Sequence, residues 1–358
     1  MAAIPFGPLE ALLRDESITE IMVNSYRRIF VEQGGQLQLV PLHFQNEQEL
    51  IKIIEGIASY CSREISQSKP YLDAHLPDGS RVNAVISPMA PGGANLTIRK
   101  FRKKPFLLDD LLQSGALDDK TAYFIHACVR ARLNIVVSGG TGTGKTTFLN
   151  ILSGFIPENE RIITIEDVAE LNLQHPNWVR LESVYGVGSN NRVTVRDCLI
   201  NSLRMRPDRI IVGECRRDET FEMLQAMNTG HEGSMTTLHA NTPRDCLARI
   251  ESLVASGNID FPIAALRKQM VSAIDIVIQL KRLRGGQRIV QEIIELTGIE
   301  QNTITTQVLF QRNFKNRQDA QITTSGMVPT FMERFAEHGI QFPPNYFDPA
   351  TKITYRPD

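Results

Sequence analysis

A glycine-rich stretch near the middle of the chain most constrains how this sequence can fold. Residues 139–147 read GGTGTGKTT, which fits the pattern G-x-x-x-x-G-K-[ST]. The apolar run Leu133–Val137 precedes it, and Phe148–Leu152 follows with the pattern of a helix start. We therefore expect a buried strand, a glycine loop and a helix, which is the context that separates a phosphate-binding loop from a flexible glycine turn.

Each residue type in this loop suits a nucleoside triphosphate. Glycines let successive backbone N–H groups curl around phosphates, and the following helix adds its positive dipole end. We expect Lys145 to reach the β- and γ-phosphates and the Thr146 hydroxyl to ligand Mg²⁺. The predicted nucleotide-binding residues are Gly139, Gly140, Thr141, Gly142, Thr143, Gly144, Lys145, Thr146 and Thr147. By itself the loop leaves ATP and GTP open.

Composition excludes several other classes of protein. The 358 residues suffice for two or three domains, and 39 basic against 40 acidic residues give a net charge of −1, which argues against a nucleic-acid-binding protein. The five cysteines are scattered without a C-x-x-C pair, so we expect no zinc site or disulfide framework and a reducing cytoplasm. The first residues lack the charged and apolar pattern of a signal peptide, and no apolar run approaches the ~20 residues of a membrane helix, so we expect neither. Any membrane role then depends on partners or surface contact.

The first hundred residues predict a small α/β domain. Short strands are expected at 20–23, 29–32 and 37–40, and a helix follows from a capping box formed by Asn46 and Glu49. A second hairpin turns at 77–79 and leads into strands at 80–85 and 96–99. Residues 101–108 are expected to be a basic linker. The run Arg99–Lys104 carries five positive charges, which fits a solvated hinge or contact with an anionic membrane surface.

From residue 109 to 358 helical and strand patterns alternate, as in a mostly parallel sheet with crossover helices. Expected strands are 161–166, 178–181, 208–214 and 235–239, and expected helices are 118–131, 194–205, 218–228, 242–255 and 262–274. A closing hairpin is expected at 276–280 and 288–296, with a Gly/Ser/Asn-rich loop at 185–191. After about residue 312 we expect a tail of short helix and coil.

Acidic residues end two of these strands, where a P-loop hydrolase needs them. Ligands bind beyond the carboxyl ends of parallel strands, and hydrolysis requires a group that orients water and a group that holds the metal. Glu214 follows four apolar residues and fits the position that holds Mg²⁺, so Glu166 is the candidate that polarises the attacking water. His239 also follows a strand and is interpreted as a hydrogen-bonding sensor of the γ-phosphate, with His231 in a nearby loop.

At these residues the chain resembles the secretion ATPase superfamily, whose members drive type II and type IV secretion and type IV pili. The resemblance spans most of residues 15–300, and its four boxes, Walker A, Asp box, Walker B and His box, correspond to residues 139–147, 165–171, 212–216 and 230–241. Within the superfamily, residues 19–24, 203–209 and 224–231 look like the CpaF/TadA ATPases of tight-adherence (Tad, type IVc) pili. The four-cysteine zinc insert of other assembly ATPases is absent from the sequence.

The resemblance implies a cytoplasmic homohexamer that binds ATP and Mg²⁺ and acts on an inner-membrane platform protein, peripheral to that membrane. Each subunit would carry a PAS-like N-terminal domain and a RecA-like motor domain, closing about residues 102–105. Alone, Arg81 and Arg99 look like solvated strand residues, but the resemblance implies that both contact the nucleotide. A type II or type IV secretion ATPase is the alternative, and a nucleic-acid translocase or a non-hydrolysing scaffold is a rival. Arg216 departs from the family pattern without an explanation from sequence.

Overall fold

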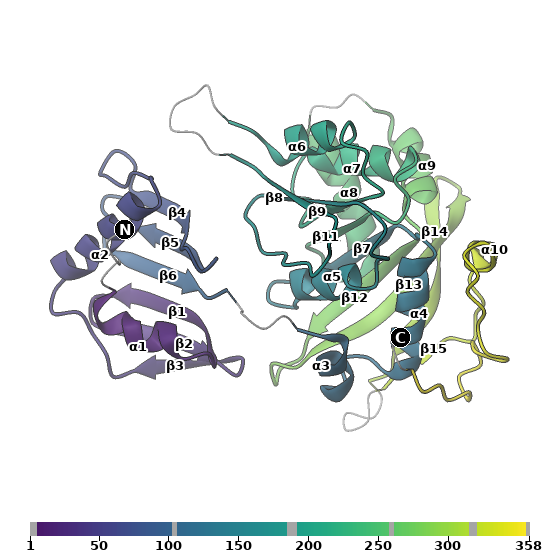
Figure 1. Cartoon of the computed structure of the whole chain (residues 1–358), viewed down its shortest axis with the longest axis horizontal. Helices are drawn as coiled ribbons and strands as arrows, with labels where there is room; N and C mark the ends of the chain where they lie inside the picture. The colour runs from purple at the N-terminus through teal and green to yellow at the C-terminus, as the bar shows by residue number, and fades with distance from the viewer. Residues whose placement is uncertain (1–5, 102–105, 185–191, 258–260, 315–320, 356–358) are drawn as a thin grey trace. The chain divides into compact units, whose positions relative to one another are not determined.

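The computed structural model of the chain describes residues 6–101, 106–184, 192–257, 261–314 and 321–355. The chain divides into two units, residues 1–105 and 106–358, called here the first and second unit (Figure 1). The core of the predicted linker, 102–105, and the predicted loop 185–191 lie outside the described residues. Each unit is described by itself below.

The first unit is built on an antiparallel sheet of six strands, which lie in the order β3-β2-β1-β6-β5-β4 (Figure 1). In chain order its elements are η1 (Gly7–Leu9), α1 (Glu10–Arg14), β1 (Ile18–Ser25), β2 (Arg28–Gln33), β3 (Gln36–Val40), α2 (Glu47–Tyr60), β4 (Tyr71–His75), β5 (Arg81–Val85) and β6 (Asn95–Arg99). Side chains of α2, including Ile54 and Ile57, pack with alternate strand residues in one buried cluster. The predicted small α/β fold is confirmed.

Local chemistry explains where several of these elements begin and turn. The Asn46 side chain accepts a 2.9 Å hydrogen bond from the backbone N–H of Glu49, which starts α2 as the capping box predicts. At the β4–β5 hairpin, Gly79 has a φ of 84° and its N–H donates to Leu76 O at 2.9 Å. A Cβ on Gly79 would lie 2.9 Å from the ring of Phe101, so the first residue of the predicted linker packs on this turn.

The second unit contains a nine-stranded sheet in the order β15-β14-β13-β12-β7-β11-β10-β8-β9. The six strands from β12 to β9 are parallel, whereas β13, β14 and β15 are antiparallel, so the sheet is mostly parallel as predicted. The strands are β7 (Ile135–Gly139), β8 (Ile162–Glu166), β9 (Trp178–Glu182), β10 (Arg209–Val212), β11 (Met235–Leu238), β12 (Ile276–Arg282), β13 (Arg288–Glu300), β14 (Thr303–Arg312) and β15 (Ile322–Thr324).

Helices pack on both faces of this sheet (Figure 1). They are α3 (Leu108–Gln113), α4 (Asp119–Arg130), α5 (Lys145–Ser153), α6 (Val195–Ser202), α7 (Glu219–Asn228), α8 (Pro243–Ser256), α9 (Ile263–Ala273) and α10 (Met332–Glu337). Ile135 and Val137 of β7 pack in one buried cluster with α4 and α5, and Val136 packs in the other with α6 to α9. Alternate residues of a strand face opposite sides, so the two clusters cover opposite faces.

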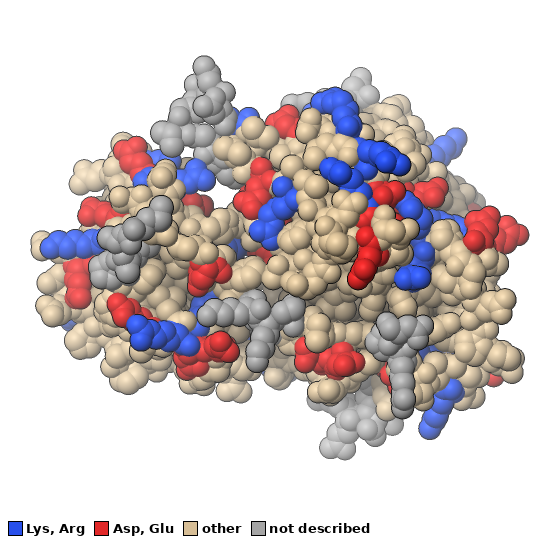
Figure 2. Space-filling model, viewed as in Figure 1, with Lys and Arg blue, Asp and Glu red and all other residues tan. Residues whose placement is uncertain are grey.

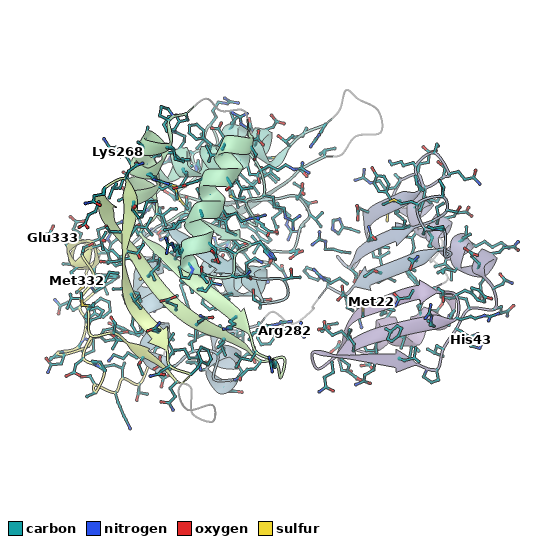
Figure 3. All side chains as sticks on the ribbon, turned by 180° about the vertical axis from the view of Figure 1, so that it is seen from behind. Met22, His43, Lys268, Arg282, Met332 and Glu333 are labelled. Atoms are coloured by element: carbon teal, nitrogen blue, oxygen red, sulfur yellow. The ribbon has the colours of Figure 1, made fainter. Side chains whose placement is uncertain are left out.

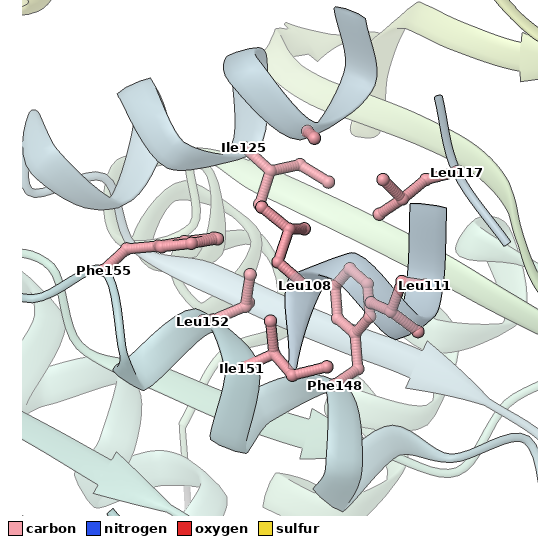
Figure 4. A pocket seen from close by; sticks show the side chains of 9 residues that line it. Leu108, Leu111, Leu117, Ile125, Phe148, Ile151, Leu152 and Phe155 are labelled. Atoms are coloured by element: carbon pink, nitrogen blue, oxygen red, sulfur yellow. The ribbon is translucent and has the colours of Figure 1, made fainter. Parts of the chain in front are cut away.

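Helix α5, which follows the glycine loop, is held in place by apolar contacts with α3 and α4. Leu108 and Leu111 of α3, Ile125 of α4, and Phe148 and Ile151 of α5 line a small apolar pocket (Figure 4). These side chains hold the first two turns of α5 against neighbouring helices. The helix that presents the loop is therefore anchored in the core.

The region after the predicted closing hairpin differs from expectation. Thr303–Arg312 forms the strand β14, and Ile322–Thr324 adds β15 at the sheet edge, neither of which the sequence predicted. The short helix α10 fits the expected tail, but Phe335 and Tyr346 are almost fully buried against α4. The Tyr346 ring lies 5.6 Å from that of Tyr123. The tail therefore belongs to the core of the second unit.

Candidate functional site

The glycine loop joins the end of β7 to the start of α5, as the sequence predicts. Gly142 and Gly144 have φ values of 71° and 89°, in the left-handed region that glycine adopts without strain. The Thr143 hydroxyl donates to Gly140 O at 2.9 Å and closes the curl of the loop. A Cβ on Gly139 would overlap with Oγ1 of Thr143 and lie 3.2 Å from Leu280 O, so a side chain there would force the loop to shift. The loop has the backbone curl of a phosphate cradle followed by a helix N-terminus.

Lys145 is the first residue of α5 and lies over this loop. Its ammonium donates to Gly140 O at 3.3 Å. Burial lowers the pKa of Lys145 from its ordinary value, and the carboxylate of Glu214 acts in the opposite direction. A partly desolvated ammonium that faces a carboxylate suits an anionic ligand at this position.

Predicted residues meet at the carboxyl edge of the parallel strands. Strands β7, β8, β10 and β11 run in parallel, so the loop, Glu166, Glu214 and His239 all follow strand ends at one edge. The hydroxyl of Thr237 in β11 donates to Gly213 O at 2.8 Å and ties the segment after β10 to β11. Electrostatic interactions link Lys145, Glu214 and His239 with one another.

His239 is held mainly in the neutral form. Burial lowers the pKa of its imidazole below the ordinary 6.5, and the Lys145 ammonium lowers it further, while Glu214 acts the other way. A neutral imidazole offers one N–H donor and one acceptor near pH 7. Hydrogen bonding to a phosphate oxygen suits it better than charge neutralisation does.

Glu166 is 3% exposed at the end of β8. Its Oε1 accepts hydrogen bonds from the backbone N–H groups of Glu170 at 2.9 Å and Leu171 at 3.0 Å. Its Cγ lies 2.9 Å from the position that a Cβ on Gly213 would take. The carboxylate thus fixes the turn after β8 against the segment after β10, a positioning role visible in the geometry alone.

Arg216, which the sequence left unexplained, forms contacts with two acidic side chains. Its Nε and Nη2 donate to Oε2 of Glu214 at 2.6 and 2.5 Å, and its Nη1 lies 3.9 Å from Oδ2 of Asp167. The guanidinium therefore bridges acidic groups that follow two neighbouring strands. No local sequence pattern signals this contact, because the strand order of the sheet creates it.

Arg249 is a second residue that sequence reasoning missed. It lies on the exposed side of α8, and its charge acts on both Lys145 and His239. Helix α8 follows β11, so its N-terminal half starts at the same sheet edge as the loop. The one sequence signal that could have identified Arg249 was the position of its helix directly after a predicted strand of the parallel sheet.

His231 lies away from the glycine loop and from His239, although the sequence suggests that it lies near His239. It precedes β11 and its carbonyl accepts from Ser234 at 2.6 Å, while the N–H of Ser234 donates to Asn134, just before β7. The loop follows the other end of β7. His231 therefore lies at the amino edge of the sheet, opposite His239.

Arg81 and Arg99 lie side by side in the first unit. They are direct partners in the antiparallel pairing of β5 and β6. Arg99 also forms an ion pair with Glu20 at 3.4 Å, although 59% of its side chain is exposed. Lys100, next in the chain, donates to Asp15 O at 2.6 Å. Both arginines belong to the first unit, so their relation to the loop stays a prediction.

The predicted Mg²⁺ donors, Thr146 and Glu214, do not belong to a larger ligand cluster. Among the described residues there is no group of three or more His, Cys, Asp and Glu side chains able to hold a metal ion. Nucleotide-bound Mg²⁺ takes one or two protein oxygens together with phosphate oxygens and water. A hydroxyl at the start of α5 and the half-buried carboxylate of Glu214 fit that mode of binding.

None of the described helices is both long enough and apolar enough to span a membrane.

Comparison with known proteins identifies relatives along most of the chain. A family model described as "Type II/IV secretion system protein" matches residues 3–319. A putative conjugal transfer protein of Mycobacterium tuberculosis is 37% identical over 82% of this chain and 85% of that protein. The type IV secretion system protein VirB11 of Bartonella quintana is 32% identical over 79% of this chain and 90% of its own. The X-ray structure of the Legionella pneumophila ATPase DotB has a TM-score of 0.55 at 22% identity, covering 82% of this chain and 80% of that one, a likeness of fold.

Proposed function

The chain belongs to the family of type II/IV secretion system proteins, and from that premise we propose that it is an ATPase that hydrolyses Mg²⁺-bound ATP. The observation that carries this proposal is that the glycine loop with Lys145, Glu214 and His239 all follow parallel strands at one edge of the sheet. Ligands bind at this edge of open α/β sheets. The family relatives named as type IV secretion proteins support the same reading.

In the proposed reaction the loop N–H groups and Lys145 bind the phosphates, and Thr146 and Glu214 hold Mg²⁺. When bound, Mg²⁺ neutralises charge on the β- and γ-phosphates. His239 donates a hydrogen bond to the γ-phosphate. Glu166 fixes the turn after β8 through its hydrogen bonds to the backbone of Glu170 and Leu171. In addition, its negative charge polarises the attacking water.

Arg81 and Arg99 complete the proposed site from the first unit. Their direct pairing across β5 and β6 places two guanidinium groups on one segment of sheet, as simultaneous contact with a phosphate chain requires. We propose that they neutralise negative charge in the transition state. The proposed domains are accordingly an N-terminal α/β domain of about residues 1–100, a linker at 101–108 and a motor domain from 109 onward.

Phosphate release by the purified chain tests the proposed activity. With Mg²⁺ and ATP we expect turnover that is lost on removal of Mg²⁺ by a chelator. Lys145→Ala is expected to abolish it, because the phosphates lose their main cationic partner. Arg284→Ala removes a charge from an exposed turn and serves as the control. Equal turnover in the Lys145→Ala variant and the unmodified chain would contradict the proposed ATPase activity.

At the level of the cell we propose a cytoplasmic homohexamer, peripheral to the inner membrane, that drives assembly of a Tad (type IVc) pilus through a membrane platform protein. The supporting residues are those that resemble the CpaF/TadA group, and the alternative is a type II or type IV secretion ATPase. Size-exclusion chromatography with and without ATP tests the hexamer. Pull-down from the membrane fraction identifies the platform and separates pilus from secretion partners.

A nucleic-acid translocase on the same core is the rival function. The net charge of −1 gives no global attraction to nucleic acid. On the face shown in Figure 2, lysine and arginine side chains are interspersed with aspartate and glutamate side chains. We expect added DNA to leave ATP turnover unchanged, and stimulation by DNA would favour the rival.

A further inference from the structure

The hairpin formed by β12 and β13 borders the glycine loop. Strand β12 pairs in parallel with β7, and Leu280 is the partner of Gly139, the last residue of β7. Residues after Leu280 therefore continue past the end of β7, alongside the loop. This hairpin has no part in the site that the sequence predicts.

Two arginines of the hairpin lie against glycines of the loop. Nη1 of Arg282 is 3.1 Å from the position that a Cβ on Gly142 would take. Cδ of Arg288 is 3.3 Å from the corresponding position at Gly144, and two of its guanidinium nitrogens are 4.0 Å away. Figure 3 labels Arg282 at the end of β12 nearest the hairpin turn. The missing side chains of the two glycines thus make room for two guanidinium-bearing side chains.

The two arginines also face each other across the hairpin. Arg282 and Arg288 are direct partners in the antiparallel pairing of β12 and β13. The pairing holds two guanidinium groups side by side next to a loop built for phosphates, an arrangement that suits an anionic ligand. A guanidinium is the side chain best suited to hold two phosphate oxygens at once.

We propose that Arg282, supported by Arg288, binds the α- and β-phosphates of the nucleotide held in the glycine loop of the same chain. The inference rests on the proposed function, because it requires a nucleotide in this loop. The assignment to the α- and β-phosphates follows from the general role of the loop that Arg282 lies against. Backbone N–H groups of such a loop cradle the α- and β-phosphates, whereas the lysine reaches the β- and γ-phosphates.

This role differs from the one proposed for Arg81 and Arg99. A group that contacts the α- and β-phosphates binds ADP and ATP alike. It therefore strengthens ground-state binding of both nucleotides, whereas a group that acts on the γ-phosphate in the transition state changes turnover. Affinity for ADP separates the two pairs of arginines.

The test is a titration of the full-length chain with fluorescent ADP and ATP analogues. Losing a charge-assisted hydrogen bond is expected to weaken binding of both by about ten- to a hundredfold in Arg282→Ala. Arg282→Lys should retain part of the affinity, because lysine keeps the positive charge but cannot bind two phosphate oxygens at once as the planar guanidinium does. Arg284→Ala, in the exposed turn between the two strands, is the matched control and should bind as the unmodified chain does.

The other outcomes reject either the role of Arg282 alone or that role together with the proposed function. Unchanged ADP affinity in Arg282→Ala, with ATP still bound by the unmodified chain, rejects the role of Arg282 and leaves the proposed function standing. An equal loss in Arg284→Ala means that general positive charge is responsible and also rejects it. Failure of the unmodified chain to bind ATP rejects both. Unfolding followed by the fluorescence of Trp178, the one tryptophan of the chain, shows whether each variant is folded.

Discussion

Glu166 combines a visible structural contact with a proposed chemical role, and one substitution separates them. Glu166→Gln keeps an oxygen that can accept from the N–H groups of Glu170 and Leu171, but it removes the charge. We expect ATP binding to persist and hydrolysis to fall by at least about 10²-fold, the range for loss of a general base. Phosphate release and ATP retention on the chain measure the two effects.

The contrary outcome for Glu166 is equally informative. Near-normal hydrolysis in Glu166→Gln would leave the carboxylate with its positioning role alone, as in a nucleotide-gated scaffold or a site with another base. Glu166→Ala is the comparison variant. It also leaves two backbone N–H groups without their acceptor, at a cost of about 1–3 kcal/mol for each group.

The lowered pKa of His239 predicts that the stability of the folded chain decreases as the pH falls. Because its folded-state pKa lies below the unfolded value of about 6.5, the unfolded chain binds a proton more readily. Its contribution to stability is fully present above pH 6.5 and is lost as the pH falls through the folded-state pKa. An NMR titration of the imidazole, assigned by its absence in His239→Gln, should give a pKa below 6.5. A value above 6.5 would contradict the described surroundings.

At the scale of elements, the contact between the ends of β8 and β10 depends on a missing side chain. A Cβ on Gly213 would lie 2.9 Å from Cγ and 3.2 Å from Oε1 of Glu166. Gly213→Ala is therefore expected to destabilise the second unit by about 1–3 kcal/mol through overpacking. Urea unfolding followed by Trp178 fluorescence measures this, since Trp178 lies in β9 beside β8.

Gly285→Ala is the matched control, because a Cβ at Gly285 meets nothing within 4 Å. It should shift the urea midpoint little. An equally small shift in Gly213→Ala would show that Glu166 moves aside at no cost, and the tight contact between the two strand ends would then have no energetic role.

Local patterns explain which elements were predictable. Residues 133–152 carry their own apolar run, glycines and helix start, so strand, loop and helix follow from near neighbours in sequence. Strand β14 was missed because its outer half, Thr303–Thr306, is polar or half-exposed and is defined by its pairing with β13. Arg249 and Arg282 were missed for the same reason. The pairing of β12 with β7 brings Arg282 to the loop, and the position of α8 after β11 places Arg249 at the same edge of the sheet.

For the whole molecule, the central prediction concerns arginines remote in sequence from the loop. Arg81→Ala and Arg99→Ala are each expected to lower ATP turnover by about 10³-fold or more, as loss of a charge-stabilising arginine does. Affinity for ADP should stay close to that of the unmodified chain. Because the two are direct strand partners, the double variant should be little worse than either single one.

Arg28→Ala is the control for these variants, since Arg28 is an exposed strand residue of the same unit. Turnover near normal in Arg81→Ala would remove the first unit from the chemistry. Steady-state phosphate release and ADP titration together distinguish that outcome from simple loss of folding.

The pairing of Arg81 with Arg99 limits which changes of length the first unit can accept. Along β5 buried Val82 and Ala84 alternate with residues that face away from the core, and β6 alternates in the same way. Inserting one residue within a strand would turn buried residues outward, such as Val82 in β5 or Leu96 in β6, or separate the two guanidinium groups, because side chains alternate with a period of two. The mostly exposed part of the connection that follows β5, residues 87–92, carries no such constraint. Insertions and deletions should therefore be tolerated in that part of the connection and rejected within β5 and β6.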